Sequence, residues 1–204
     1  MNIILLRENE MKKFIILALL LVVIVSGTFA LDKNIGFGFG GNYAETKGTI
    51  DVFYSDADWT MTRSGAYIFM FFGISRFIEL NLGYIQKWPD DIKIDGQSYN
   101  ASELESTGAL QAGIYGKFPI TLGSRFVLFP TAGLDFEFTL DNSEEWWHEL
   151  WLRGGVGADF FLGKKLFLRA HLLGGYAFPF GGDSELGVKS SWGFQAKLGI
   201  GWML

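Results

Sequence analysis

The closing stretch of the chain, residues 190–204, constrains the fold more than any other. It reads SSWGFQAKLGIGWML, with large or apolar residues at every second position from Trp192 to Leu204 and small or polar ones, including Gln195 and Lys197, between them. Successive side chains of a β-strand point to opposite faces, so this stretch predicts a strand with one apolar face. A soluble sandwich would bury that face. A membrane barrel would turn it to lipid and point Gln195 and Lys197 inward.

The N-terminal residues have the pattern of an export signal. Met11 and two lysines precede an apolar run over 14–25, and small residues follow as far as Ala30. The run of about twelve residues is short for a membrane-spanning helix, which needs about 20. We expect residues 1–30 to be a signal peptide with its true start at Met11, the alternative being an N-terminal anchor helix. Residues 31–204 then form one domain.

Period-two alternation recurs along the rest of the chain. The 27 glycines, the 4 prolines and the aromatic content of 17% favour short strands and tight turns. We expect strands at about 34–43, 65–74, 77–87, 106–118, 125–138, 149–161, 166–177 and 190–204. The second is apolar on both faces, so its orientation stays open. Pro130 in the fifth indicates a bulge or a later start, because proline removes a ladder donor.

The connections alternate between long and short. Long polar segments occupy about 45–63, 88–105, 139–148 and 178–189, and tight turns join the other strands. An even strand number with long loops at one end is typical of outer-membrane barrels. The ten steps from Trp192 to Trp202 cover roughly 25 Å at a tilt of about 40°, which is the height of the apolar band. The sequence therefore predicts an all-β fold, an eight-stranded antiparallel up-and-down transmembrane β-barrel.

This geometry assigns side chains to two places. Aromatic residues at the strand ends are expected at the membrane interfaces: Tyr43, Tyr84, Phe118, Phe126, Phe138, Phe160, Tyr176, Trp192 and Trp202. Polar residues on the opposite parity are expected to fill the interior as a plug: Glu79, Gln111, Asp135, Glu137, Arg153, Asp159, Arg169, His171, Gln195 and Lys197. Buried charges must be paired, so we expect Asp159 opposite Arg169 and Asp135 near Arg153.

The leader, the eight alternating strands and the aromatic last strand resemble the small outer-membrane barrels typified by OmpX and the membrane domain of OmpA. The resemblance covers essentially all of residues 31–204 and implies location in the bacterial outer membrane. In that family the last strand is the assembly signal and usually ends in Phe, whereas this chain ends in Leu204. Expected partners are outer-membrane lipid and lipopolysaccharide, the barrel-assembly machinery through the C-terminal strand, and an unidentified surface ligand.

The sequence offers little catalytic chemistry. Outer-membrane lipid A deacylases use a His and a Ser two residues apart, but Leu150 follows His148 and Leu173 follows His171 at that spacing. The net charge of −5 and the lack of cysteine disfavour nucleic-acid binding and thiolate metal sites. We expect no enzyme, cofactor or metal, but a structural or surface-interaction role through long extracellular loops. A lipid-modifying enzyme, a narrow channel and a secreted lipocalin-like carrier are the alternatives.

Overall fold

Eight antiparallel strands pair edge to edge in a closed ring. The computed structural model describes residues 33–52, 55–101, 106–140, 148–180 and 186–204. The expected signal peptide lies outside these residues. Ring strands are β1 (Asn34–Val52), β2 (Ser55–Gly73), β3 (Ile78–Ile94), β5 (Thr107–Lys117), β7 (Phe126–Thr139), β8 (His148–Phe161), β9 (Leu166–Phe180) and β10 (Leu186–Met203). Each pairs with its neighbour in sequence, and β10 pairs with β1, which confirms the predicted eight-stranded up-and-down barrel.

The registers define the stagger of the barrel. The line of paired residues runs from Gly36 through Phe71, Asn81, Gly113, Asp135, Trp151, Ala177 and Ser191 to Thr46. One circuit therefore returns to β1 ten residues further along the strand. With about 3.3 Å per residue and about 4.8 Å between strands, this stagger tilts the strands by roughly 40°, as is usual for barrels. An interior of this size is filled by side chains.

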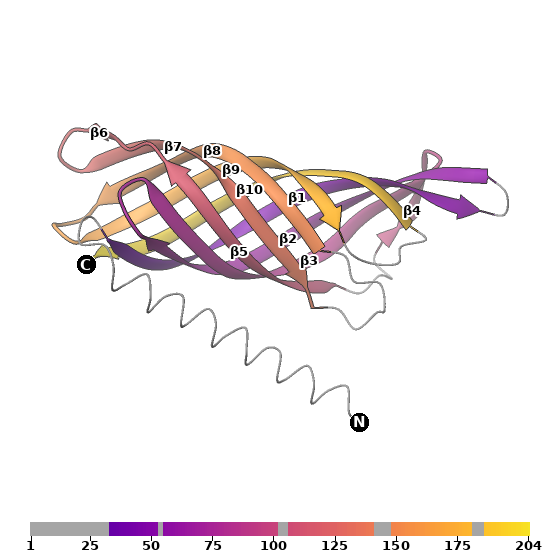
Figure 1. Ribbon diagram of the computed structural model, residues 1–204. Helices are drawn as coiled ribbons and strands as arrows, with labels where there is room; N and C mark the ends of the chain where they lie inside the picture. The colour runs from indigo at the N-terminus through magenta and orange to yellow at the C-terminus, as the bar shows by residue number, and fades with distance from the viewer. Residues whose placement is uncertain (1–32, 53–54, 102–105, 141–147, 181–185) are drawn as a thin grey trace, which may run out of the picture.

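Short and long connections are sorted to opposite ends of the barrel (Figure 1). Residues 74–77 and 162–165 are tight turns, closed by the backbone bonds Ile74 N–H to Ile78 O at 3.0 Å and Leu162 N–H to Leu166 O at 2.9 Å. The C-terminus lies at this end, which we call the turn end. The opposite end, the loop end, carries the β1–β2 hairpin and the hairpin that β3 forms with the short strand β4 (Gln97–Asn100). Among the described residues no helix is long and apolar enough to cross a membrane.

Three of the expected long loops are largely strand, and this is a correction. In segment 178–189, β9 continues to Phe180 and β10 begins at Leu186. The pairing of β1 with β2 continues to Val52 opposite Ser55, through most of the segment 45–63. In segment 88–105, β3 turns at Asp95 and Gly96, both at positive φ, into the short strand β4 (Gln97–Asn100). These extensions lack one continuous apolar face, so the pattern that identifies a membrane strand does not reveal them.

The fifth strand forms as β7 from Phe126 with Pro130 inside it, so a later start is wrong, and its pairing with β8 passes through Pro130 without the bulge that was the other expectation. The short strand β6 (Ile120–Leu122) pairs with the first residues of β7, and β5 pairs from Thr131 onward. Segment 119–124, expected as a simple turn, therefore contains a strand. The carbonyl of Pro130 accepts a hydrogen bond from Phe118 N–H at 3.0 Å. The backbone of Pro130 therefore faces the break between β5 and β6. The missing proline donor falls where the ladder is already interrupted.

Candidate functional site in the barrel interior

The outward face of the barrel is an apolar band whose large side chains are exposed. Side chains such as Phe39, Ile68, Leu134 and Leu198 are more than two-fifths exposed on it. The predicted interface aromatics all point outward, although Tyr43 and Tyr84 lie in the interior of the long strands β1 and β3 and not at their ends. Eight of the nine are at least 36% exposed, and Phe138 is half-buried because it stacks on the ring of His148 at 4.5 Å. In water such a surface would be very unfavourable, whereas lipid is its natural solvent.

Trp192 has the contacts expected of an interfacial residue. Its ring packs edge-on against Tyr43 with centroids 6.1 Å apart, and its indole N–H donates to Glu45 Oε1 at 3.0 Å. Glu45 in turn lies 3.1 Å from Lys47 Nζ. The aromatic body therefore meets the apolar band on one side and charged groups on the other, which marks the loop-end boundary of the band.

The structure places all ten predicted plug residues inside the barrel, each less than one-tenth exposed. It also places there Arg63, Lys87, Lys117 and Glu149, which the sequence analysis did not include. Lys87 and Lys117 continue the inward parity of Glu79 and Gln111, so extending the alternation to the strand ends would have found them. Glu149 likewise shares the parity of Arg153 and Asp159 in the expected strand 149–161. Arg63 follows a polar segment and precedes the strand that the sequence could not orient, so no alternation indicates where its side chain points.

The turn-side network consists of Glu79, Lys117, Asp159 and Arg169. Arg169 and Asp159 are cross-strand partners, as predicted, and form a bidentate pair with two N···O distances of 2.6 Å. Arg169 also pairs with Glu79, whose second contact is Lys117 Nζ at 2.9 Å. The guanidinium of Arg169 lies over the rings of Phe71 and Phe167, 4.5 and 4.8 Å from their centroids. Both carboxylates of this network are therefore compensated.

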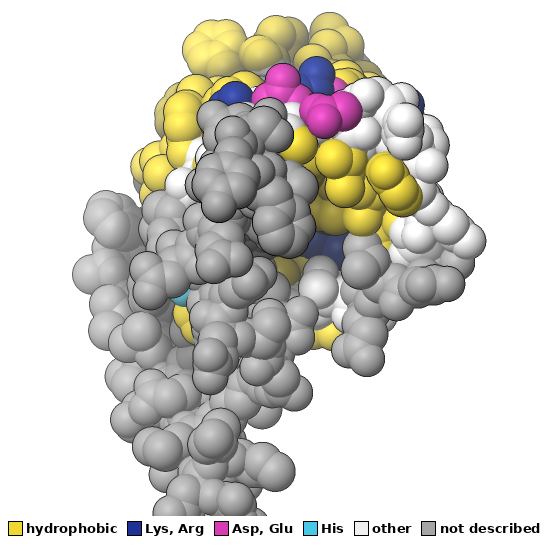
Figure 2. Space-filling model, turned by 90° about the vertical axis from the view of Figure 1, so that its right-hand side faces the viewer, with side chains coloured by type: hydrophobic (Ala, Val, Ile, Leu, Met, Phe, Trp, Pro, Cys, Tyr) yellow, Lys and Arg dark blue, Asp and Glu magenta, His cyan; other side chains and the backbone are white. Residues whose placement is uncertain are grey.

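The loop-side network consists of Arg63, Lys87, Asp135, Glu137, Glu149 and Arg153. Arg153 lies 2.8 Å from Asp135 and 2.9 Å from Glu137. Asp135 and Arg153 are therefore close together, as predicted. Lys87 joins Glu137 to Glu149, and Arg63 contacts Glu149 at 2.7 Å. Figure 2 looks onto the loop end and shows basic side chains at the floor of a hollow there.

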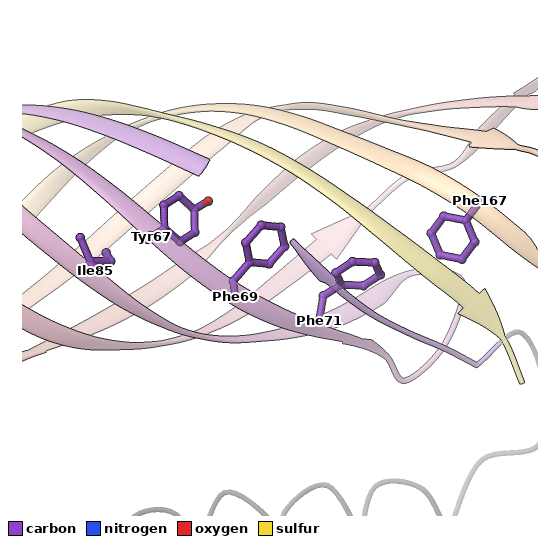
Figure 3. Close-up of a cluster of buried hydrophobic side chains, with 5 residues drawn as sticks. All are labelled: Tyr67, Phe69, Phe71, Ile85 and Phe167. Carbon is purple, nitrogen blue, oxygen red and sulfur yellow. The ribbon is translucent and has the colours of Figure 1, made fainter. Parts of the chain in front are cut away.

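Aromatic rings fill the space beside these networks. Figure 3 shows Tyr67, Phe69 and Phe71 in a row on β2, continued by Phe167 of β9, with successive ring centroids 5.4 to 6.1 Å apart. This row resolves the orientation of the second strand. Its rings lie over the inward glycines of β1, because a Cβ at Gly36 or Gly38 would approach the rings of Phe71 and Phe69 within 2.7 Å. The glycines provide the room that a narrow barrel needs for these rings.

The two histidines stand in different surroundings. His171 faces the interior opposite Gly157, in the predicted register, with its ring 5.3 Å from that of Phe129. His148 faces outward against Phe138. Neither lies beside a serine of the described residues on its strand face. Among the described residues, no group of three or more His, Cys, Asp or Glu could hold a metal ion.

An inward face of ion pairs and an outward apolar band define a small transmembrane β-barrel. No family model matches the sequence, and no curated protein matches it. Among solved structures, it is similar to the outer-membrane protein OprG of Pseudomonas aeruginosa, with 14% identity over 85% of this chain and 96% of that chain and a TM-score of 0.52. This likeness supports the outer-membrane type of barrel fold.

Two further solved structures match at lower TM-scores. The N-terminal β-barrel domain of Pseudomonas aeruginosa OprF has 17% identity over 85% of this chain and 98% of that chain, with a TM-score of 0.43. Neisserial surface protein A has 14% identity over 82% of this chain and 97% of that chain, also with a TM-score of 0.43.

Proposed function

We propose that this protein is a closed, non-catalytic barrel of the bacterial outer membrane that acts through the hairpins at its loop end. The observation that carries the proposal is the interior itself. Charged side chains bridge the barrel at two levels, and aromatic rings occupy the space beside and between them. Outer-membrane lipid and lipopolysaccharide surround the apolar band, and the aromatic C-terminal strand is the part that the assembly machinery recognises.

The loop end supports an interaction role. Beyond Glu45, which marks the boundary of the apolar band, β1 and β2 remain paired from Thr46 to Val52. These seven residues extend the hairpin by roughly 23 Å along the strand at about 3.3 Å per residue. Exposed aromatic side chains lie at the same end, including Trp88 and Tyr99. A paired hairpin presents a surface at little entropic cost on binding, because its backbone is already ordered.

The described residues do not favour the catalytic alternative. His171 is enclosed in the interior, and His148 packs against the ring of Phe138 on the outward face. The channel alternative predicts the opposite of our proposal for ion flow. We therefore expect purified barrels in planar lipid bilayers to give no single-channel steps, with heat-modifiable gel migration of the same preparation as the check that they are folded. Conductance steps from folded wild-type protein would contradict the closed interior.

Orientation is testable because the chain contains no cysteine. Ser98→Cys in β4 and Ser124→Cys at the turn end replace exposed residues at opposite ends of the barrel. On intact cells we expect a membrane-impermeant maleimide to label the Ser98→Cys variant alone, and to label Ser124→Cys only after the outer membrane is opened. Labelling of Ser124→Cys on intact cells would reverse the orientation and remove the surface role of the hairpins.

The role of the β1–β2 hairpin itself needs a shortened variant. Replacing residues 48–59 by Asn-Gly joins Lys47 to Thr60, which are already cross-strand partners, through a two-residue turn. We expect this variant to assemble normally. Cells that make it should nevertheless match a strain without the protein in their detergent tolerance and in how strongly the cells aggregate. Wild-type behaviour of those cells would mean that the barrel suffices and that the hairpin has no part in function.

A further inference from the structure

Between the two networks lies a polar group that neither network includes. Lys197 and Gln195 of β10, His171 of β9 and Tyr67 of β2 are each at most 4% exposed. Lys197 and His171 are cross-strand partners, and Gln195 lies two residues along β10 on the same face. Within the described part of the chain, Lys197 Nζ, both ring nitrogens of His171, both amide atoms of Gln195 and the Tyr67 hydroxyl lack a hydrogen-bond partner. Buried polar groups of native proteins rarely remain unpaired.

The charges of the described interior do not balance. The buried cations are Arg63, Lys87, Lys117, Arg153, Arg169 and Lys197, and the buried carboxylates are Glu79, Asp135, Glu137, Glu149 and Asp159. Every one of these carboxylates is in an ion pair with one or more of the first five cations. No carboxylate of the described residues lies within 4.0 Å of Lys197 Nζ. One positive charge is therefore in excess, deep inside the barrel, where an unpaired charge is costly.

The surroundings of Lys197 compensate this charge in part. Its Nζ lies 5.0 Å from the ring centroid of Tyr115 and 5.5 Å from those of Tyr67 and Phe69, so three aromatic rings stabilise the cation. Ring faces do not replace the acceptors that an ammonium group uses in water, since it carries three N–H donors. Two further neighbours, His171 and Gln195, bring polar atoms without hydrogen-bond partners, the amide N–H groups of Gln195 and a ring N–H of His171 among them.

We propose that the middle of the barrel binds one small monovalent inorganic anion, of the size and charge of chloride, against Lys197. The anion balances the excess charge and accepts hydrogen bonds from the ammonium group, from the side-chain amide of Gln195 and from a ring N–H of His171. The site requires the closed interior described above, but it is independent of the surface role of the hairpins. A surface role could fail while this site remains, and the converse also holds.

The direct test is a crystal structure with bromide. Protein unfolded in urea is refolded in sodium bromide, so that the ion can enter before the barrel closes, and anomalous differences are recorded at the bromine edge. We expect one anomalous peak next to Lys197 Nζ. The peak should be absent from Lys197→Met, which keeps an unbranched side chain, and present in Lys164→Met, which changes an exposed lysine of a turn. Ordered water without anomalous signal at Lys197 would overturn the proposal, as would bromide bound only elsewhere.

A second test measures the same site in lipid vesicles. An anion that binds only the folded state raises the folded-to-unfolded ratio about tenfold for each tenfold rise in its concentration above the dissociation constant. Urea unfolding of the wild type should therefore show greater stability in sodium chloride than in sodium gluconate at equal ionic strength. Lys197→Met should show the same stability in both salts. If this variant does not fold, the wild type decides alone, since equal stability in the two salts together with no bromide peak overturns the proposal.

Discussion

Arg169 shows how one buried side chain joins distant strands of the barrel. From β9 it reaches Asp159 on β8 and Glu79 on β3, and it contacts Asn34 on β1 at 3.4 Å. Lys117 supports Glu79 only, so Asp159 has no second cation among the described ion pairs. In this environment a carboxylate without its partner is more unfavourable than the absence of the whole pair.

Arg169→Met should therefore destabilise the protein strongly. We expect a loss of about 3–5 kcal/mol in the free energy of unfolding, because Asp159 and one contact of Glu79 are left uncompensated. Urea unfolding in lipid vesicles measures this difference. The control is Arg125→Met at the turn end, where the side chain is exposed and a change within about 0.5 kcal/mol is expected. Equal stability of the two variants would show that the turn-side network is not structural.

At the scale of elements, the closure of the ring depends on how β1 fits against β2. Gly38 faces inward, and a Cβ there would lie 2.7 Å from Phe69 Cζ and 2.1 Å from the backbone oxygen of Leu198. Gly41 faces outward, where the nearest atom to a Cβ is the backbone oxygen of Gly65 at 3.6 Å. The same substitution at these two positions therefore separates interior packing from strand propensity.

Gly38→Val should cost about 1–3 kcal/mol, because the ring of Phe69 and the neighbouring backbone must move to admit the side chain. Gly41→Val should be neutral or slightly stabilising, since a β-branched residue suits an outward strand position. The unfolding free energy and the heat-modifiable gel migration of both variants measure the effect. A loss of similar size in both would point to backbone flexibility of β1 rather than to packing against β2.

The sequence predicted the elements wherever one face met lipid. Alternation over residues 190–204 identified β10 and its inward residues, and the tight turns fixed the pairing of Asp159 with Arg169. It could not orient β2, because both faces of β2 are apolar, one turned to lipid and the other to aromatic packing. The relevant signal lies on β1, whose inward glycines stand opposite the inward rings of β2. Arg63 was missed for a related reason, since the polar hairpin around it has no continuous apolar face.

At the scale of the whole molecule, the apolar band and the interior networks stabilise the barrel in different ways. The networks compensate charge inside the ring, while the band requires that no charge be placed on the lipid side. Leu198 is 54% exposed and lies between Trp192 and Trp202 on the outward face, with Phe39 and Ala170 as cross-strand neighbours. Lys197, the adjacent residue, carries its charge inward. Adjacent residues of a strand point to opposite faces, so a cation is tolerated at position 197 and unfavourable at position 198.

Leu198→Arg places a cation on the lipid side beside that inward lysine. We expect it to cost about 2–4 kcal/mol, the usual penalty for arginine near the bilayer midplane of a barrel. Leu122→Arg, on the exposed strand β6 at the turn end, should cost about 1 kcal/mol or less, because it lies near the interface. Urea titrations of both variants in vesicles measure the difference. Should the two substitutions cost the same, the outward face would not be embedded in lipid, and the apolar band would need a protein partner instead.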